Sequence, residues 1–259
     1  MLVTSGGSKK SNRILMRRII IFGLFLFIAT WLLAYDNQDD LDKIEWTKYS
    51  DEDNIQVYEA KRAHKSGLIP IKVHTILNYP ITKVISVLTD ASRKTEWVPR
   101  LDVSKTVEQL SFGEFIDYAS FDAPWPFEDR DFLVYIKTNY DIEKKEVKAI
   151  IYSVTHPQMP NRKGFVRGHT FSGNTYLKSV YNDTKTYVEI SFFNDYKGNI
   201  PKWIVNMVQL TWPRTFIGQL RTQLARKDVP DTYQNLDVVT KYLEKKQQHQ
   251  VTHGATVQK

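Results

Sequence analysis

Among the charged clusters in this sequence, Arg130 with its neighbours Asp129 and Asp131 is the clearest candidate for a chemical role. A guanidinium group makes strong, directional hydrogen bonds, so Arg130 could bind the polar end of a ligand or orient the mouth of a cavity. The alternative is structural, because an ion pair with a carboxylate would close the end of a strand. We favour the structural interpretation and keep ligand binding as the second hypothesis.

Residues suited to catalysis or metal binding form no recognisable arrangement. The chain has no cysteine, which excludes disulfides, thiolate metal sites and cysteine nucleophiles. Its six histidines lack metal-ligand spacing, such as two histidines four residues apart on a helix. The sequence also lacks a nucleophile elbow, a phosphate-binding loop and a dinucleotide fingerprint. We therefore expect no catalytic residue, no metal and no cofactor.

The formal charge of +7 is unevenly distributed. Five basic residues fall within the first 18 positions: Lys9, Lys10, Arg13, Arg17 and Arg18. Without those five of the 36 basic residues, 31 remain against 29 acidic ones, and they form no basic cluster. Nucleic-acid binding requires such a cluster, so we expect no nucleic-acid partner.

The run from Ile19 to Ala34 is uncharged and mostly apolar, and it follows the basic segment 1–18 directly. It is short for a transmembrane helix and long for the core of a signal peptide. Because the residues before Ala34 make a poor cleavage site, we favour a signal anchor over residues 19–35 to a cleaved signal peptide. Either version keeps the basic side in the cytoplasm. The main domain should then be extracytoplasmic, membrane-anchored or secreted, with a bacterial periplasm as the expected compartment.

Residues 41–226 form one continuous domain, followed by a polar tail over 227–259. Residues 42–49 predict a short opening helix, and residues 81–90 predict a second helix. Many short alternating segments joined by turn sequences predict an antiparallel, strongly curved sheet. The expected strands are 55–61, 69–77, 104–110, 114–121, 132–140, 147–154, 164–171, 175–180 and 187–193. A turn is expected at 172–174.

The stretch from Gly198 to Leu224 predicts one long helix, with Pro201 in its first turn. Apolar residues recur at every fourth position: Ile204, Val208, Trp212, Phe216, Leu220 and Leu224. Such a row drifts about 40° per step around a helix of 3.6 residues per turn. It therefore forms a broad, winding stripe that suits a wide concave surface. Pro213 predicts a kink in the helix.

Three segments occur in an order that is similar to a known family: PWPFEDRDF over 124–132, HPQMPNRKGFVR over 156–167, and the helix over 198–224. Together they resemble START domains, the steroidogenic-acute-regulatory-protein-related lipid-transfer domains of the helix-grip superfamily, over about residues 41–225. The resemblance implies an α+β helix-grip fold, in which a curved antiparallel sheet wraps around the long C-terminal helix and encloses a lipid-sized cavity. It also implies that this helix acts as a lid, with the 156–164 loop beside it as a second moving part.

The resemblance suggests five apolar ligand-binding candidates. Trp97, Trp125 and Trp203 would line the cavity or its rim, where aromatic rings could hold a choline head, or would serve as ordinary core residues. Met207 and Val208 would face the sheet if the helix is oriented as in the family. Methionine suits adaptable contacts with varied acyl chains.

Polar candidates are fewer. Asp117 could be a buried acid, although strand alternation alone does not settle which way it points. Arg130 corresponds to the arginine of the family motif. Some sterol and ceramide carriers of the family pair an acidic residue on one strand with a basic residue six positions beyond this arginine. That position is Ile136 here, so the resemblance implies that this polar anchor is missing. Asn206 and Gln209 would border the inward face of the helix, where they could bind a ligand or be solvated.

Two classes of function follow from these observations. The first is a non-enzymatic monomer that binds a phospholipid or similar amphiphile and carries or presents it between membranes. Its partners would be the lipid and a membrane surface. The alternative is a cyclase- or aromatase-type enzyme of the same superfamily acting on a polyketide or isoprenoid, which would need acids or bases over its substrate. An envelope interaction protein with a collapsed cavity is a third hypothesis.

Overall fold

The computed structural model describes residue 41 and residues 43–233 of the chain. The predicted segments 1–18 and 19–35, and the tail beyond residue 233, lie outside the described residues. The described strands are β1 (Trp46–Glu52), β2 (Ile55–Ala60), β3 (Ile71–Leu77), β4 (Leu101–Ser111), β5 (Glu114–Phe121), β6 (Asp129–Asp141), β7 (Glu146–Ser153), β8 (Phe165–Arg167), β9 (His169–Val180) and β10 (Lys185–Asp195). The described helices are α2 (Ile81–Thr89), the short 3₁₀ helix η1 (Ala91–Glu96) and α3 (Lys202–Ala225).

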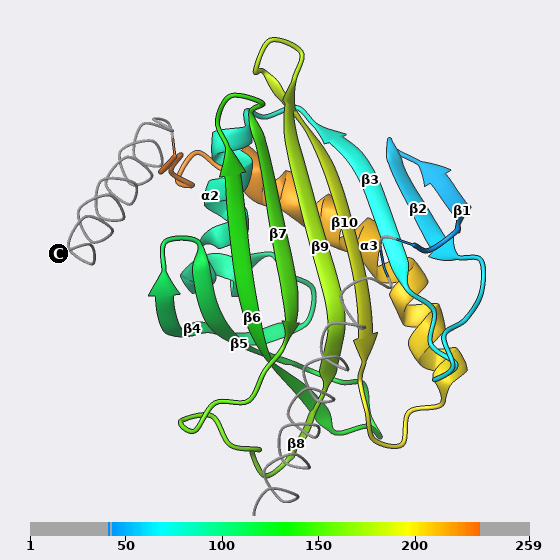
Figure 1. The fold of residues 1–259 in the computed structure, drawn as a ribbon. Coiled ribbons are helices and arrows are strands. Elements are labelled where there is room, and N and C mark those ends of the chain that lie inside the picture. Colours follow the sequence, from blue (N-terminus) through cyan, green and yellow to red (C-terminus); the bar gives the residue numbers. More distant parts are fainter. Residues whose placement is uncertain (1–40, 42, 234–259) are drawn as a thin grey trace, which may run out of the picture. The chain divides into compact units, whose positions relative to one another are not determined.

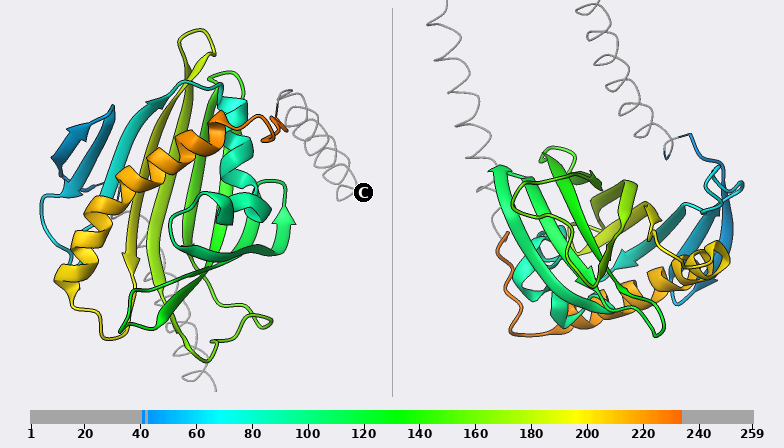
Figure 2. Two further views of the ribbon diagram at one scale, coloured as in Figure 1. Left: turned by 180° about the vertical axis from the view of Figure 1, so that it is seen from behind. Right: turned by 90° about the horizontal axis from the view of Figure 1, so that it is seen from below.

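These strands form one sheet in the spatial order β1-β2-β3-β10-β9-β7-β6-β5-β4, with β8 paired in parallel to the start of β6. Consecutive strands are neighbours from β1 to β3 and from β4 to β7, whereas α2 and η1 carry the chain between the two sides of the sheet. The sheet is strongly curved, and α2 and α3 lie on its concave side (Figures 1 and 2). The predicted α+β architecture, a curved antiparallel sheet around a long C-terminal helix, is confirmed.

The first described element differs from the prediction. Residues 46–52 form strand β1, which pairs antiparallel with β2, and they are not part of an opening helix over 42–49. Asp53 and Asn54 connect the two strands with φ angles of 54° and 58°, as a two-residue hairpin turn requires. Pairing with β2 therefore overrides the weak helical pattern of this segment.

The predicted turn at 172–174 is also wrong, because β9 runs unbroken from His169 to Val180. Gly173 pairs with Phe192 of β10 on one side and Ile151 of β7 on the other. A Cβ atom added to Gly173 would lie 3.4 Å from the Cβ of Ile151. This glycine marks a close approach within the sheet and not a reversal of the chain.

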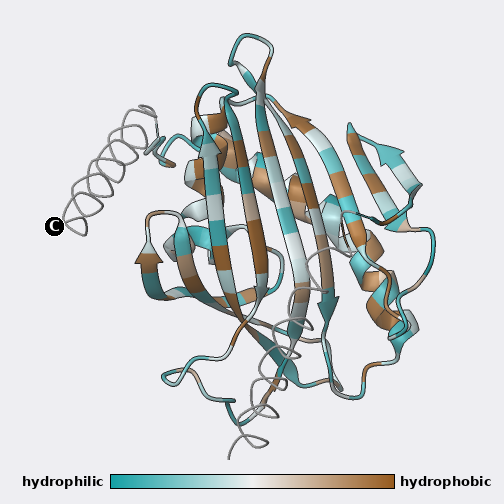
Figure 3. Cartoon of the chain, in the orientation of Figure 1, coloured by the Kyte–Doolittle hydropathy of each residue, from teal (hydrophilic) through white to brown (hydrophobic). Residues whose placement is uncertain are grey.

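The main core lies where α2 and α3 cover the concave face of the sheet. Figure 3 shows hydrophobic residues alternating along the strands that face these helices. The most completely buried members include Val57, Ile71, Val73, Val188, Val84, Ile85, Ile217, Leu220 and Leu224. The alternation on the strands follows from the two-residue period of a sheet with one buried face.

The predicted helix is confirmed as α3, which continues through Pro213. Its predicted apolar row is buried only at the C-terminal end, at Phe216, Leu220 and Leu224. Before Pro213 the inward positions belong to Val205 and Gln209. The reason is the drift of about 40° per step, which rotates a four-residue row away from the sheet over several turns.

Candidate functional site

Strand register identifies the side chains on the concave face. Phe192 of β10 meets Trp212 of α3, with 5.6 Å between ring centroids, so Phe192 points toward the helix. Pairing carries the same face through β9 to Ile151 of β7, then to Ile136 of β6 and Phe115 of β5. Alternate residues along each strand share this face.

The concave face over β5–β7 is only partly covered. Phe115, Val134, Ile136 and Ile151 are only partly buried, although they lie on the face that is covered elsewhere. They pack against neither the main core nor the smaller buried cluster. Val188 on β10, which faces the C-terminal half of α3, is by contrast fully buried. We call these four residues the open part of the concave face.

Four aromatic rings form a row beside the open part. Trp97, at the end of η1, lies 5.1 Å from Phe216 of α3, measured between ring centroids. Phe216 stacks on Trp212 at 4.6 Å, and Trp212 meets Phe192 edge-on. Such ring pairs add to the free energy gained by burial alone. The row connects η1, α3 and β10 across the concave side.

Asp117 lies on the concave face, because it pairs with Val134 of the open part. Thr106 of β4 donates a hydrogen bond to Asp117 Oδ1 at 2.8 Å, and Lys94 Nζ of η1 lies 3.6 Å from Asp117 Oδ2. The Asp117 and Lys94 side chains are 14% and 21% exposed. The sequence alone did not settle which face of the sheet the Asp117 side chain takes, and it did not indicate Lys94 as a site residue. This trio is the polar group of the concave face and can bind the polar end of a ligand.

The Arg130 side chain joins two segments of the backbone. It does so through hydrogen bonds to backbone carbonyl groups, and not through the ion pair with a carboxylate that the sequence suggested. Its Nε donates to Tyr196 O at 3.3 Å and its Nη2 donates to Lys197 O at 3.4 Å. Its Nη1 donates to Glu128 O. Arg130 is 4% exposed, and this burial lowers the pKa of its guanidinium. The residue therefore fastens the segment before α3 to the start of β6.

Tyr196 is another ionisable group on this side of the sheet. Its ring meets Phe132 edge-on at 5.7 Å, and Phe132 shares a strand face with the open part. Burial raises the pKa of Tyr196 to about 12, so its phenol is neutral at physiological pH. It supplies ring surface and a hydroxyl group, but no charge.

The three candidate tryptophans lie in different environments. Trp97 is 4% exposed and belongs to the main core. Trp125, in the connection between β5 and β6, is 93% exposed, and Trp203, in the first turn of α3, is 67% exposed. The structure therefore does not bring the three rings together.

The prediction that Met207 and Val208 face the sheet is wrong. They are 52% and 42% exposed, and Val205 and Gln209 occupy the inward positions of the same turns. The expected row of apolar residues turns away from the sheet in this part of α3, because a four-residue row drifts by about 40° per step around the helix. These side chains form part of an exposed apolar surface on the N-terminal half of α3.

Asn206 bridges α3 and the segment before β3. Its Oδ1 accepts a hydrogen bond from Ile69 N at 3.1 Å, and its Nδ2 donates to Gly67 O at 3.0 Å. Both ends of the amide are therefore used in holding the helix. Gln209, one turn later, is fully buried, and its side-chain amide has no hydrogen-bond partner among the described residues.

The 156–164 loop lies on the convex side of the sheet and not beside α3, so its predicted position is wrong. Met159 packs against Ile116 and Leu133, whose side chains alternate with those of the concave face. Arg167, just after the loop, binds both carboxylate oxygens of Asp131, at 2.7 and 3.0 Å. The Asp131 side chain is 1% exposed. The two sequence motifs thus meet in a buried, bidentate ion pair.

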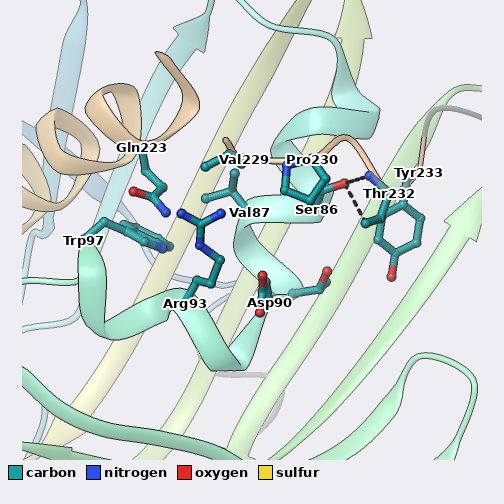
Figure 4. A pocket seen from close by; sticks show the side chains of 11 residues that line it. Ser86, Val87, Asp90, Arg93, Trp97, Gln223, Val229, Pro230, Thr232 and Tyr233 are labelled. Carbon is teal, nitrogen blue, oxygen red and sulfur yellow. Dashed lines mark hydrogen bonds between the residues drawn. The ribbon is translucent and has the colours of Figure 1, made fainter. Parts of the chain in front are cut away.

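A pocket of about 230 Å³ lies where the segment after α3 crosses α2 (Figure 4). Thr232 donates to Ser86 Oγ from its backbone N–H and from its hydroxyl, each at 3.0 Å. Thr82 Oγ1 donates to Asp231 Oδ2 at 2.8 Å. These bonds hold residues 231–232 against α2. Another pocket, of about 650 Å³, lies near the β1–β2 and β9–β10 turns.

Within the described part of the chain, His, Asp and Glu side chains form no group that could hold a metal ion. The same residues contain no helix that is long and apolar enough to cross a membrane.

A family model described as START domain matches residues 37–211. The START domain-containing protein 10 of human and of mouse is 25% identical over 127 residues, which cover 49% of this chain and 43% of each relative. A match to the F-box/WD repeat-containing protein A-like protein of Dictyostelium discoideum covers 10% of that protein. The chain therefore spans less than half the length of these relatives.

Two solved structures show the same fold. Human STARD10 superposes with a TM-score of 0.65 at 20% identity, covering 80% of this chain and 78% of that one. A STAR-related lipid transfer protein fragment from Xanthomonas axonopodis superposes with a TM-score of 0.62 at 24% identity, covering 70% and 99%. At these identities the likeness concerns the fold alone.

Proposed function

The chain belongs to the START domain family, and from this premise we propose that it binds a phospholipid or similar amphiphile and carries or presents it between membranes. The observation that carries the proposal is the open part of the concave face, where apolar side chains keep accessible surface inside the curve of the sheet. A lipid tail would cover this surface.

The energetics of lipid transfer agree with such a site. Each methylene removed from water gains about 0.8 kcal/mol, so an acyl chain of about 16 carbons gains roughly 13 kcal/mol. A carrier can compete with a membrane only if it offers the chain a comparably dry environment. Phe115, Val134, Ile136 and Ile151 supply apolar walls, and the ring row beside them extends the apolar surface.

The exposed apolar residues at one end of the molecule support a membrane surface as the second partner. Trp125 lies in the β5–β6 connection, and Trp203 and Met207 lie in the first turns of α3. Arg130 joins the start of β6 to the segment before α3, so these exposed side chains come from neighbouring parts of the fold. Tryptophan favours the interface between water and lipid. We propose that this end approaches the membrane.

The direct test is mass spectrometry of lipid that co-purifies with the full chain, followed by transfer between vesicles. Ile136→Trp should fill the open part and remove bound lipid while the protein stays folded. Ile76→Trp is the matched control, because Ile76 is 38% exposed and its neighbours Thr75 and Leu77 take the buried face of β3. The proposal fails if wild-type protein holds no lipid and moves none.

The enzyme alternative is favoured by one observation, the approach of Asp117 and Lys94 on the concave side at 3.6 Å. An acid and a base over a bound polyketide or isoprenoid could move protons. Because the two groups form an ion pair with each other, a structural or ligand-binding role is a simpler proposal than acid–base catalysis. If Asp117→Asn left lipid binding intact and abolished conversion of a bound polyketide, the enzyme alternative would replace ours.

The cellular setting is part of the same proposal. The basic segment 1–18 followed by the apolar run 19–34 supports a membrane-anchored or secreted protein whose lipid-binding domain is extracytoplasmic, in a bacterial periplasm. Protease added to intact spheroplasts should then digest the domain. Protection of the domain until the inner membrane is broken would contradict this placement.

A further inference from the structure

Two glutamines of α3 are almost completely buried but differ in their partners. Gln223 is 3% exposed, and its Nε2 donates a hydrogen bond to Glu96 Oε2 at 2.9 Å. Gln209 is 0% exposed, and neither its Nε2 nor its Oε1 has a hydrogen-bond partner among the described residues. The side-chain amide of Gln223, near the C-terminal end of α3, is therefore hydrogen-bonded, whereas that of Gln209, in the N-terminal half, has no partner among the described residues.

An unpaired buried amide is unfavourable, because the group loses its hydrogen bonds to water and gains none in return. The helix backbone adds to this at the same residue, since Pro213 has no N–H to donate to the carbonyl of Gln209. A leucine of similar size would avoid the side-chain part of the cost. Unsatisfied buried groups in folded proteins call for a specific explanation, such as a bound water, an ion or a ligand.

Gln209 lies in the half of α3 that precedes Pro213, close in the chain to the row of aromatic rings. It lies on the inward face of α3 between Val205 and Pro213, one turn before Trp212. Trp212 belongs to the ring row beside the open part. The surrounding turns carry exposed Met207 and are held to the segment before β3 by Asn206.

We infer that Gln209 recognises the polar group of the bound lipid, and that this group both donates and accepts hydrogen bonds. The inference rests on the proposed lipid-binding function and names the ligand class for the same site. Gln209 Oε1 requires a donor and Nε2 requires an acceptor. A hydroxyl or an amide meets both needs, whereas an ester or a phosphodiester offers acceptors alone. Because Gln209 is sealed in this structure, the N-terminal half of α3 must move outward when the lipid enters.

The test uses the purified full chain and phosphatidylcholine vesicles that contain dioleoylglycerol and its acetylated ester in equal amounts. These two lipids differ in one hydroxyl group. Wild-type protein should extract dioleoylglycerol in preference to the acetylated form. In Gln209→Leu the preference should fall by about tenfold, the value of one hydrogen bond at the upper end of its usual range. Protein-bound lipid is measured by mass spectrometry after the vesicles are removed.

Gln223→Leu is the matched control, because it replaces a buried glutamine whose partner is present. It should keep the lipid preference and lower the unfolding midpoint, whereas Gln209→Leu should leave that midpoint unchanged or raise it. The inference is overturned if wild-type protein takes phosphatidylcholine or the acetylated ester as readily as dioleoylglycerol. It is also overturned if Gln209→Leu keeps the preference, or if it destabilises the protein as Gln223→Leu does. Extraction of no lipid at all overturns the proposed function itself.

Discussion

The two halves of α3 on either side of Pro213 pack in opposite ways. After Pro213 the buried residues are four hydrophobic side chains, Phe216, Ile217, Leu220 and Leu224, together with Gln223, which is hydrogen-bonded to Glu96. Before it, three large hydrophobic side chains point to solvent: Trp203, Met207 and Val208. The buried positions of this first half include Gln209, whose side-chain amide has no partner among the described residues. This half is held to the rest of the protein by the Asn206 amide, by the ion pair of Lys202 with Asp195 and by packing of Leu210 and Trp212 on the main core. One continuous helix thus has an apolar anchor at one end and a weakly held end at the other.

This difference indicates how one helix can support both folding and ligand entry. Burial of apolar surface supplies most of the free energy that fixes an element, so the C-terminal half should open only with the whole domain. The N-terminal half has less buried apolar surface, contributed by Val205, Leu210 and Trp212, and should open at a smaller free-energy cost. Mutations in the two halves should therefore separate stability from lipid exchange.

The strongest test of the anchored half is Leu220→Ala. Leu220 is fully buried in the main core, so its truncation should lower the free energy of unfolding by about 2–5 kcal/mol. Urea unfolding followed by circular dichroism measures the change. Val208→Ala, in the exposed half, removes less side chain and should change the unfolding free energy by less than about 0.5 kcal/mol. Equal losses in the two variants would remove the contrast between the halves.

A smaller effect on stability is expected for Asn206→Ala. This change removes the hydrogen bonds to Ile69 N and Gly67 O, each of which contributes about 0.5–1.5 kcal/mol. Because these bonds hold only the N-terminal half, amide hydrogen exchange should accelerate in residues 202–212 and stay unchanged around Leu220. Uniform acceleration along α3 would show that the helix opens as one unit.

The fold was largely predictable from sequence because its signals are local. Two-residue alternation placed β5 at its observed bounds, and Pro201 marked the start of the long helix. The errors arose where a distant partner decides the structure. Trp46–Glu52 becomes a strand because β2 pairs with it, and Gly173 stays in a strand because β7 and β10 pack on both sides.

The candidate site was less predictable, because it depends on relations between elements. Asp117 could be assigned to the concave face only from strand register, and Lys94 approaches it only because η1 packs beside β4. The prediction for Met207 and Val208 depended on how α3 is rotated about its axis. No local sequence pattern indicates that rotation, because one of the inward positions is occupied by a polar residue, Gln209.

Acidification should weaken the C-terminal end of α3 selectively. Hydrogen bonds from Arg93 and Gln223 lower the pKa of Glu96 from 4.5 to about 2. Because the folded form binds this proton less readily than the unfolded form, the contribution of Glu96 is present above pH 4.5 and is lost as the pH falls toward 2. The effect should be small, because Glu96 is exposed enough for solvent screening. Glu96→Gln should reduce the acid dependence of the unfolding midpoint, whereas an unchanged dependence would exclude Glu96 as its source.

The smallest effect on stability and the clearest effect on exchange should come from Trp203→Ala. Trp203 is 67% exposed in the first turn of α3, so its removal should change the free energy of unfolding by less than about 0.5 kcal/mol. If this end of the helix approaches the membrane, the loss of an indole ring should slow lipid transfer between vesicles and weaken vesicle association. Tyr181→Ala is the control, because Tyr181 is 63% exposed in the β9–β10 turn, away from α3's first turn. Equal slowing in both variants would point to a nonspecific loss of apolar surface. Slowing in Trp203→Ala alone would assign membrane contact to the weakly held half of α3.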